Sequence, residues 1–208
     1  IIQLARSDDV AIPPNQCCSV LNYVFASVFH KCAPATLPSV NNCSYLPMNS
    51  IYIDWVGIQK LIENLKISSS GEDSINCKMF KITEPYSSIM LSVLFSQSLA
   101  SSVLPSDWKV GKVVPVPKYG NTHSPDNYRP ISLTSIPCKI LEYIIHSHLI
   151  DFLESNFFFS TEQHDFRKTF LCETQLICFI NDLFTHTDMG FDIDCVFLDF
   201  AKAFDSFT

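Results

Sequence analysis

Apolar residues recur with helical periodicity in five stretches of the chain. In residues 20–30, valines at every fourth position lie beside a second column of Leu and Phe residues, which predicts an amphipathic helix. Asp54 precedes the next periodic stretch as an expected N-cap, and Pro85 precedes the one after it. The helices predicted in this way span about 20–30, 55–66, 86–98, 135–154 and 172–185.

Two other stretches have the composition of β-strands. The segment VGKVVPVPK, residues 110–118, is rich in valine, but its two prolines cannot donate to a ladder, so it predicts an edge strand or a strand that ends in an extended segment. Residues 119–130 (YGNTHSPDNYRP) predict a turn-rich loop. The apolar run before Asp199 predicts a buried strand over residues 192–199. Together with the helices, these strands predict an α+β fold.

The end of that last strand carries a carboxylate. Asp199 directly follows Val196, Phe197 and Leu198, where an isolated ionised carboxylate would be costly. A bound metal cation would keep the carboxylate ionised. The alternative is an aspartate that ends the strand and starts a turn. Both interpretations of Asp199 remain open from this segment alone.

The composition favours a folded protein over a disordered tail. The chain has 208 residues, of which 47% are apolar, enough for a sizeable core. It begins with Ile1 and ends just after a strand-turn signal, so we expect a fragment of a longer protein. Neither a signal peptide nor a membrane-spanning apolar run is recognisable. We therefore expect an intracellular protein, cytoplasmic or nuclear, that is not secreted.

Nine cysteines occur without any Cys-x-x-Cys pair. This spacing argues against structural zinc, and the odd number fits reduced thiols. Cys178 and Cys195 lie in apolar stretches, so we expect them to behave as small buried hydrophobes. His148 lies on the apolar stripe of its helix and is expected in the core.

Charge is distributed unevenly along the chain, whose net charge is −7. Residues 109–139 carry five basic side chains against Asp126 alone, whereas residues 140–208 carry three basic and twelve acidic side chains. Such a division fits a protein that binds phosphates in one place and cations in another. An ordinary solvated surface would give the same distribution.

Six segments, in a fixed order, resemble the reverse transcriptase of non-LTR (LINE-like, Jockey-type) retrotransposons. They are NLKISSSGEDSINCKMFK, LPSDWKVGKVVPVPKYG, DNYRPISLTSIPCKILEYII, STEQHDFRK, CETQLICFINDL and VFLDFAKAFD. The resemblance implies part of a polymerase right hand, with fingers and the start of the palm. Residues 1–100 would form a helical linker region upstream of the polymerase, and residues 101–208 a truncated N-terminal part of the reverse transcriptase domain.

The same resemblance assigns roles around the last segment. Asp199 matches the first catalytic aspartate and would bind both Mg²⁺ ions, with the backbone carbonyl of Phe200 as a further ligand. Lys202 and Ala203 would line the turn that faces the triphosphate. Phe204 matches the aromatic residue that excludes a 2′-hydroxyl, although a core phenylalanine is the alternative. Asp205 is expected to be a turn or surface acid.

Basic residues upstream match phosphate contacts of the family. Arg167 would bind the nucleotide triphosphate with its planar guanidinium, assisted by Lys168. Lys112, Lys118 and Arg129 would face template or nucleotide phosphates, while a structural arginine bridging loop carbonyls is equally open for Arg129. Tyr128, Trp108 and Glu142 are expected to serve in packing or ion pairs.

Three positions depart from the family pattern. Relatives read Gly-Phe-Arg-Lys-Gly around the matched arginine, whereas this chain has Asp165 and Thr169 at the two glycine positions. Ser74 likewise replaces a glycine in the upstream segment. These changes restrict the backbone, and Asp165 places a negative charge close to Arg167.

The resemblance therefore implies a fragment of an RNA-directed DNA polymerase that transfers nucleotides from dNTPs to a DNA primer on an RNA template. The family's Ala-Asp-Asp hairpin, which carries the second catalytic aspartate motif, does not occur before Thr208. We expect that the chain alone cannot extend a primer. The alternative is a catalytically dead remnant that binds nucleic acid or a protein. A nuclease or phosphatase using Asp199 and Asp205 is a third hypothesis.

Overall fold

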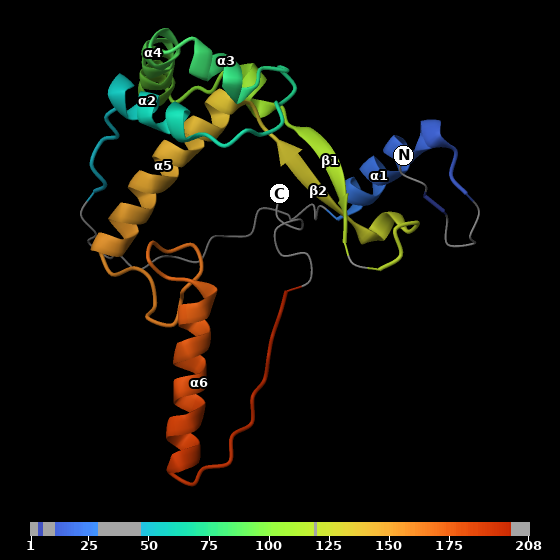
Figure 1. Ribbon diagram of the computed structural model, residues 1–208, viewed down its shortest axis with the longest axis vertical. Helices are drawn as coiled ribbons and strands as arrows, with labels where there is room; N and C mark the ends of the chain where they lie inside the picture. Colours follow the sequence, from blue (N-terminus) through green and yellow to red (C-terminus); the bar gives the residue numbers. More distant parts are fainter. Residues whose placement is uncertain (1–3, 6–10, 29–46, 119, 201–208) are drawn as a thin grey trace, which may run out of the picture. The chain divides into compact units, whose positions relative to one another are not determined.

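The computed structural model describes residues 4–5, 11–28, 47–118 and 120–200, which are mostly helical with one small sheet (Figure 1). These residues form two compact units: residues 52–143 with the N-terminal segment, and residues 144–200 with residues 47–51. The elements are α1 (Pro14–Ser27), α2 (Trp55–Asn64), α3 (Cys77–Ile82), α4 (Tyr86–Ser101), β1 (Lys112–Pro117), β2 (Tyr128–Leu133), α5 (Ile136–Ser155) and α6 (Cys172–Asp188), with short 3₁₀ turns at Ser106–Lys109 and Pro125–Asn127.

All five helices predicted from apolar periodicity are present. In α2, the Asp54 side chain accepts a hydrogen bond from the Gly57 N–H at 3.3 Å, which confirms the expected N-cap. Helix α1 begins six residues earlier than its apolar pattern, at Pro14, and the predicted residues beyond 28 lie outside the described part of the chain. Helix α3 was not predicted, because a helix of 6 residues is too short to show periodicity.

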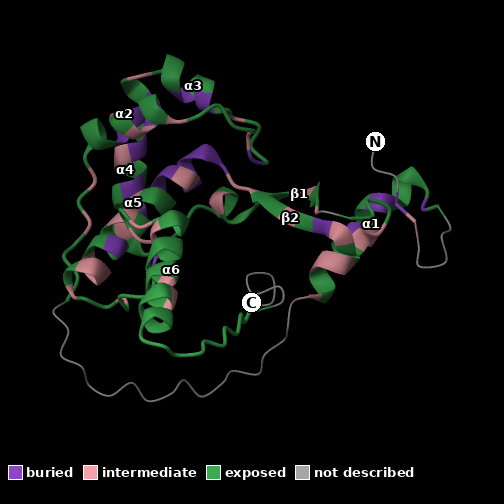
Figure 2. Cartoon of the chain, turned by 60° about the horizontal axis from the view of Figure 1, so that its bottom comes forward, coloured by how far each residue is buried: buried purple, intermediate pink, exposed green. Residues whose placement is uncertain are grey.

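Two groups of buried side chains stabilise the first unit, together with the buried side chains at the start of α5, namely Ile136, Cys138, Ile140 and Leu141. Helices α2, α3 and α4 contact one another, and their buried side chains are those drawn in purple on these helices in Figure 2. The second group packs α1 and residues before it against Tyr128, the first residue of β2. Its members are Leu4, Ile12, Cys17, Leu21 and Tyr128. The Tyr128 hydroxyl donates to the Thr122 carbonyl at 2.8 Å, so this tyrosine serves in packing, as expected.

Strand β1 confirms the predicted edge strand. It pairs antiparallel with β2, from Lys112 opposite Leu133 to Pro117 opposite Tyr128. Strand β2 begins within the segment expected to be a loop. The prediction missed its start because Pro130 is typical of turns. Pro130 lies opposite Pro115, so both missing N–H donors fall in a single pair of the ladder.

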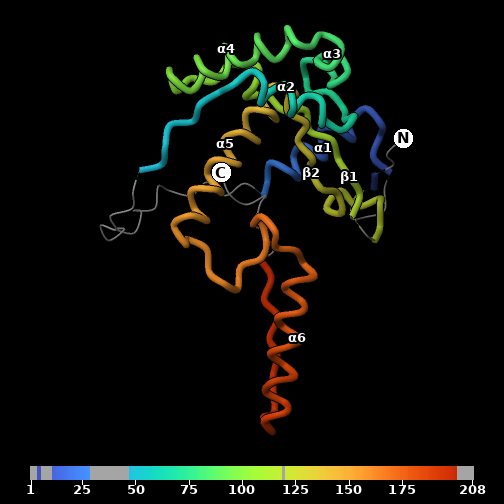
Figure 3. Tube along the Cα trace, turned by 60° about the vertical axis from the view of Figure 1, so that its left-hand side comes forward, coloured from blue at the N-terminus to red at the C-terminus, as the bar shows by residue number. Residues whose placement is uncertain are grey.

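The predicted strand over residues 192–199 is wrong. Residues 191–200 adopt neither helix nor strand, and Val196, Phe197 and Leu198 are each more than 80% exposed. A strand needs a hydrogen-bonding partner, and within the described residues β1 and β2 pair only with each other. The segment instead turns back beside α6 (Figure 3), where the Phe197 ring lies 5.9 Å from that of Phe179.

Three side chains expected in the core are exposed. Cys178 lies on the surface because α6 buries none of its residues, and Cys195 is exposed in the segment that follows α6. His148 is also exposed, with its Nδ1 2.9 Å from the Ile144 carbonyl oxygen. Trp108 has its expected packing role, because its ring meets that of Phe95 edge-on at 5.5 Å. Glu142, expected in packing or an ion pair, instead accepts a hydrogen bond from the thiol of Cys138.

Within the described ranges, Cys18, Cys77, Cys138, Cys172, Cys178 and Cys195 are free thiols. Over the same ranges, no helix combines the length and apolar character needed to cross a membrane.

Candidate functional site

The first candidate surface is one face of the β1–β2 pair. Side chains alternate along a strand and directly paired residues share a face, so Lys112 and Arg129 lie on the same face at opposite ends. Val114 and Ile131 lie between them, and Val116 is the direct partner of Arg129. Both cations are exposed, and neither forms an ion pair with another described residue. Lys118, just beyond β1, is half-buried. This face could hold an anionic chain against a partly apolar surface.

The second candidate site surrounds Arg167 in the loop that joins α5 to α6, residues 156–171. Arg167 donates from Nε and Nη2 to the two carboxylate oxygens of Glu154, at 2.8 and 2.9 Å. Its Nη1 donates to the carbonyl oxygens of Ser160 and Gln163, at 3.0 and 3.1 Å. The side chain of Arg167 is only 12% exposed. The arginine therefore gathers the loop around the last turn of α5.

Two aromatic rings enclose the guanidinium. Its central carbon lies 4.2 Å from the centroid of the Phe170 ring and 5.5 Å from that of Phe159. These distances are in the range of favourable cation–π contacts. The hydrogen bonds and charge of Arg167 lower the pKa of Glu154, and those of Glu154 raise the pKa of Arg167.

Lys168, the next residue of the loop, also contacts the C-terminal end of α5, but through a different acidic residue. Its ammonium group pairs with the Asp151 carboxylate, and both side chains are more than half exposed. An exposed pair of this kind contributes little stability. Lys168 is thus accessible to solvent, whereas the neighbouring Arg167 is enclosed.

A buried histidine, His164, connects the loop to the start of α6. The Nδ1 atom of His164 lies 2.7 Å from the hydroxyl oxygen of Thr174 in the first turn of α6. That hydroxyl also donates to the Leu171 carbonyl oxygen at 2.7 Å, so His164 is the donor in their contact. The His164 ring meets the Phe170 ring edge-on at 4.8 Å. Together these contacts tie the loop that contains Arg167 to both flanking helices.

The predicted metal ligands lie in the exposed segment after α6. Asp199 is exposed, and Phe200 is 86% exposed. Lys202, Ala203 and Phe204 lie outside the described residues. Where the chain is described, no group of three or more His, Cys, Asp or Glu side chains could hold a metal ion. A two-metal centre needs more ligands than the Asp199 carboxylate and one carbonyl, so these residues do not complete it.

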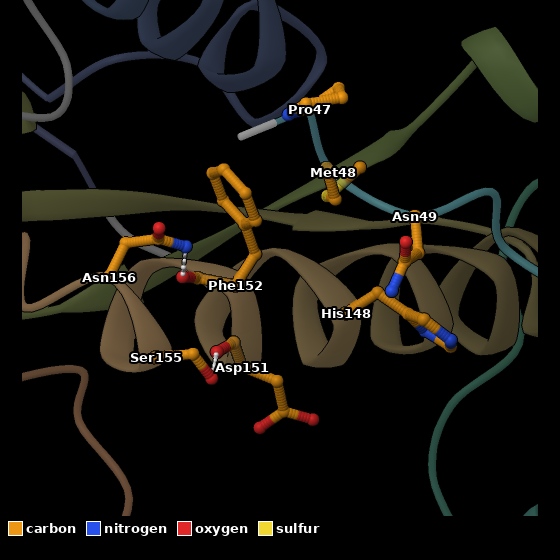
Figure 4. A pocket seen from close by; sticks show the side chains of 8 residues that line it. All are labelled: Pro47, Met48, Asn49, His148, Asp151, Phe152, Ser155 and Asn156. Atoms are coloured by element: carbon orange, nitrogen blue, oxygen red, sulfur yellow. Dashed lines mark hydrogen bonds between the residues drawn. The ribbon is translucent and has the colours of Figure 1, made fainter. Parts of the chain in front are cut away.

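The second unit also contains a cavity of about 590 Å³ beside the C-terminal half of α5 (Figure 4). Two polar side chains of its lining form hydrogen bonds with the backbone of α5. Ser155 donates to the Asp151 carbonyl oxygen at 2.7 Å, and Asn156 donates to that of Phe152 at 2.8 Å. The opposite wall comes from Pro47, Met48 and Asn49. The sequence did not predict this cavity, because its two walls are about a hundred residues apart in the chain.

Sequence reasoning also missed Glu154 as a site residue. It was identified only as the end of a helix, and nothing in the sequence links it to an arginine thirteen residues later. The pairing depends on the path of the intervening loop, including left-handed backbone at Phe157, Phe166 and Thr169.

The chain is a distant, partial homologue of reverse transcriptases from non-LTR retrotransposons of Drosophila. It is 26% identical over 165 residues to the probable RNA-directed DNA polymerase from transposon BS of Drosophila melanogaster, a match that covers 75% of this chain and 18% of the relative. The probable RNA-directed DNA polymerase from transposon X-element of the same species is 26% identical over 136 residues, which are 65% of this chain and 15% of the relative. The RNA-directed DNA polymerase from mobile element jockey, also of that species, is 27% identical over 107 residues, which are 50% of this chain and 12% of the relative.

These matches confirm the family resemblance found in the sequence. No protein-family model matches the chain. The matched region spans less than a fifth of the length of each of these relatives.

Proposed function

We propose that this chain forms part of an RNA-directed DNA polymerase of a non-LTR retrotransposon, which transfers nucleotides from dNTPs to a DNA primer on an RNA template. The observation that carries this proposal is the similarity to three transposon polymerases over half to three quarters of the chain. The chain would supply the fingers and the start of the palm.

Three groups of residues would bind the template phosphates, the nucleotide and the metal ions, respectively. Lys112, Lys118 and Arg129 would contact template or nucleotide phosphates, which the exposure of Lys112 and Arg129 supports. Arg167 and Lys168 would bind the triphosphate, together with Lys202, Ala203 and the sugar-contacting Phe204. Asp199 and the Phe200 carbonyl would provide oxygen ligands for Mg²⁺. When bound, two such ions stabilise the attacking and leaving oxygens of the displacement.

Salt-dependent binding tests the phosphate contacts. We would measure the affinity of the chain for a fluorescent RNA–DNA template–primer by anisotropy over a range of salt concentrations. Each of Lys112→Gln and Arg129→Gln should lower the slope of log affinity against log salt by about one. Lys78→Gln is the matched control, because Lys78 is an exposed cation on α3 of the same unit. Equal slopes in all four proteins would contradict the proposed role of this face.

A second candidate function is a catalytically dead remnant that only binds nucleic acid or a protein. It is favoured by the observation that, over the described ranges, Asp199 belongs to no group of side chains able to hold a metal. Primer extension with dNTPs and Mg²⁺ tests the second candidate, because incorporation of nucleotides would exclude it. We expect no extension by this chain alone. Incorporation that disappears in Asp199→Ala would exclude the remnant and identify an active polymerase.

A further inference from the structure

The hydrogen-bonding capacity of Arg167 is almost fully used within the protein. A guanidinium carries five N–H donors. Four of them are engaged: two by the carboxylate of Glu154 and two by the carbonyl oxygens of Ser160 and Gln163. The second N–H of Nη2 has no hydrogen-bond partner among the described residues. Arg167 can therefore accept a new bidentate partner only by giving up one that it already has.

The edge bound by Glu154 is one that suits a phosphate. Nε and Nη2 form a planar fork that accepts two oxygens side by side, from a carboxylate or from a phosphate. The Nη1 edge is held instead by two backbone carbonyls of the loop, which cannot leave without unwinding it. Of the two ion-pair partners, Glu154 is the more accessible, at 28% exposed against 12% for Arg167. Glu154 thus occupies the replaceable position.

The location of Glu154 makes this exchange feasible. It lies in the last turn of α5, where the helix dipole disfavours a negative charge. Arg167 compensates for this charge, and a side chain that is partly exposed can return to water when the pair separates. The contacts of Arg167 with Phe159 and Phe170, and with the two loop carbonyls, do not involve Glu154 and can hold the guanidinium in place.

We propose that Glu154 acts as an internal competitor for the phosphate-binding edge of Arg167, and that a triphosphate binds this arginine only by displacing the Glu154 carboxylate. This inference rests on the proposed function, in which Arg167 contacts the nucleotide triphosphate. It adds a regulatory contact: the affinity for triphosphate is set by the strength of the Arg167–Glu154 pair.

The test is the affinity of the purified chain for inorganic triphosphate, measured by isothermal titration calorimetry without Mg²⁺ at low ionic strength. Glu154→Gln keeps the shape of the side chain but removes the charge that competes, so triphosphate should bind about tenfold more tightly than to the unaltered chain. Glu173→Gln is the charge-matched control. Glu173 lies in the first turn of α6 and makes no hydrogen bond or ion pair with another described side chain. Its substitution should change the affinity by less than about twofold.

A double variant identifies the receiving group. The gain of Glu154→Gln should disappear in Glu154→Gln/Arg167→Gln, because the freed edge is then absent. If Glu154→Gln leaves the affinity unchanged, or lowers it towards that of Arg167→Gln, the carboxylate supports the arginine and the competitor role is wrong. In that case, weaker binding by Arg167→Gln alone would still support the phosphate contact in the proposed function. If none of these proteins binds triphosphate, both the competitor role and that phosphate contact are contradicted.

Discussion

Among the described residues, five that are not glycine hold backbone conformations that glycine adopts more easily, and Thr169 and Ser74 are two of them. Thr169 has φ +68° and Ser74 has φ +58°, in the left-handed region that disfavours a Cβ atom. Both stand where the family resemblance expects glycine. We predict that Thr169→Gly raises the free energy of unfolding by about 1 kcal/mol, since relief of strain exceeds the added freedom of the unfolded chain. Urea denaturation would measure this change.

Gly71 provides the opposite case for comparison. A Cβ atom at this position would lie 2.8 Å from the backbone nitrogen of Ser135, closer than packing allows. Gly71→Ala should therefore lower the free energy of unfolding. An unchanged or lowered stability in Thr169→Gly would show that its backbone is not strained in solution.

The Glu154 carboxylate makes stability depend on pH. Its pKa in the folded chain lies below the ordinary value of 4.5, chiefly because of its hydrogen bonds from Arg167. Such a group stabilises the fold above its ordinary pKa, and this contribution is lost as the pH falls through the lowered pKa. We predict that Glu154→Gln melts at a lower temperature than the unaltered chain at about pH 7, and that the difference shrinks as the pH falls below the ordinary pKa of 4.5. A difference that is independent of pH would contradict this origin.

At the scale of the element, the N-cap of α2 is the clearest local determinant. The Asp54 side chain satisfies the N–H of Gly57, which has no partner within the helix. We predict that Asp54→Ala lowers the free energy of unfolding by about 1 kcal/mol, while Asp54→Asn preserves most of the stability. Equal losses in the two variants by chemical denaturation would mean that the charge, and not the cap, is responsible.

Elements with strong local signals were predictable, and those that depend on distant partners were not. Helices α2 and α5 follow from apolar spacing, and α2 also from its capping residue, both of which act within a few residues. Strand β2 escaped prediction because its pairing with β1, and not its own sequence, makes it a strand. The apolar run before Asp199 has strand composition, yet no described strand pairs with it.

The candidate site shows the same division. The sequence identified Arg167 through its local motif, but its hydrogen-bonding partner Glu154 lies on the preceding helix. The enclosure of Arg167 between Phe159 and Phe170 depends on the path of the whole loop. Residue types therefore indicated which chemistry to expect, and only the three-dimensional path showed which of the guanidinium's donors are already engaged.

At the scale of the whole molecule, the cysteines of the described residues divide by burial. Cys17, Cys77 and Cys138 are buried, and burial, with the nearby Glu142, raises the pKa of Cys138 to about 11. Cys18 is exposed in the first unit, and Cys172, Cys178 and Cys195 are exposed in the second. We predict that iodoacetamide modifies these exposed thiols much faster than the buried ones, because only accessible thiolates react. Peptide mapping by mass spectrometry would measure the order. Rapid labelling of Cys138 in the native chain, at the rate found in urea, would contradict its burial.

The two units should differ in local stability. Helix α4 buries Leu91 and Phe95 almost completely, whereas α6 buries none of its residues and leaves Leu176, Ile177 and Phe184 at least 59% exposed. Opening α6 therefore exposes little additional apolar surface, and we predict that its amides exchange with deuterium faster than those of α4. Hydrogen-exchange mass spectrometry over a dilution series measures this difference. Protection of α6 equal to that of α4 and lost on dilution would mean that association covers its apolar side chains. Equal protection that persists at every concentration would contradict the predicted difference outright.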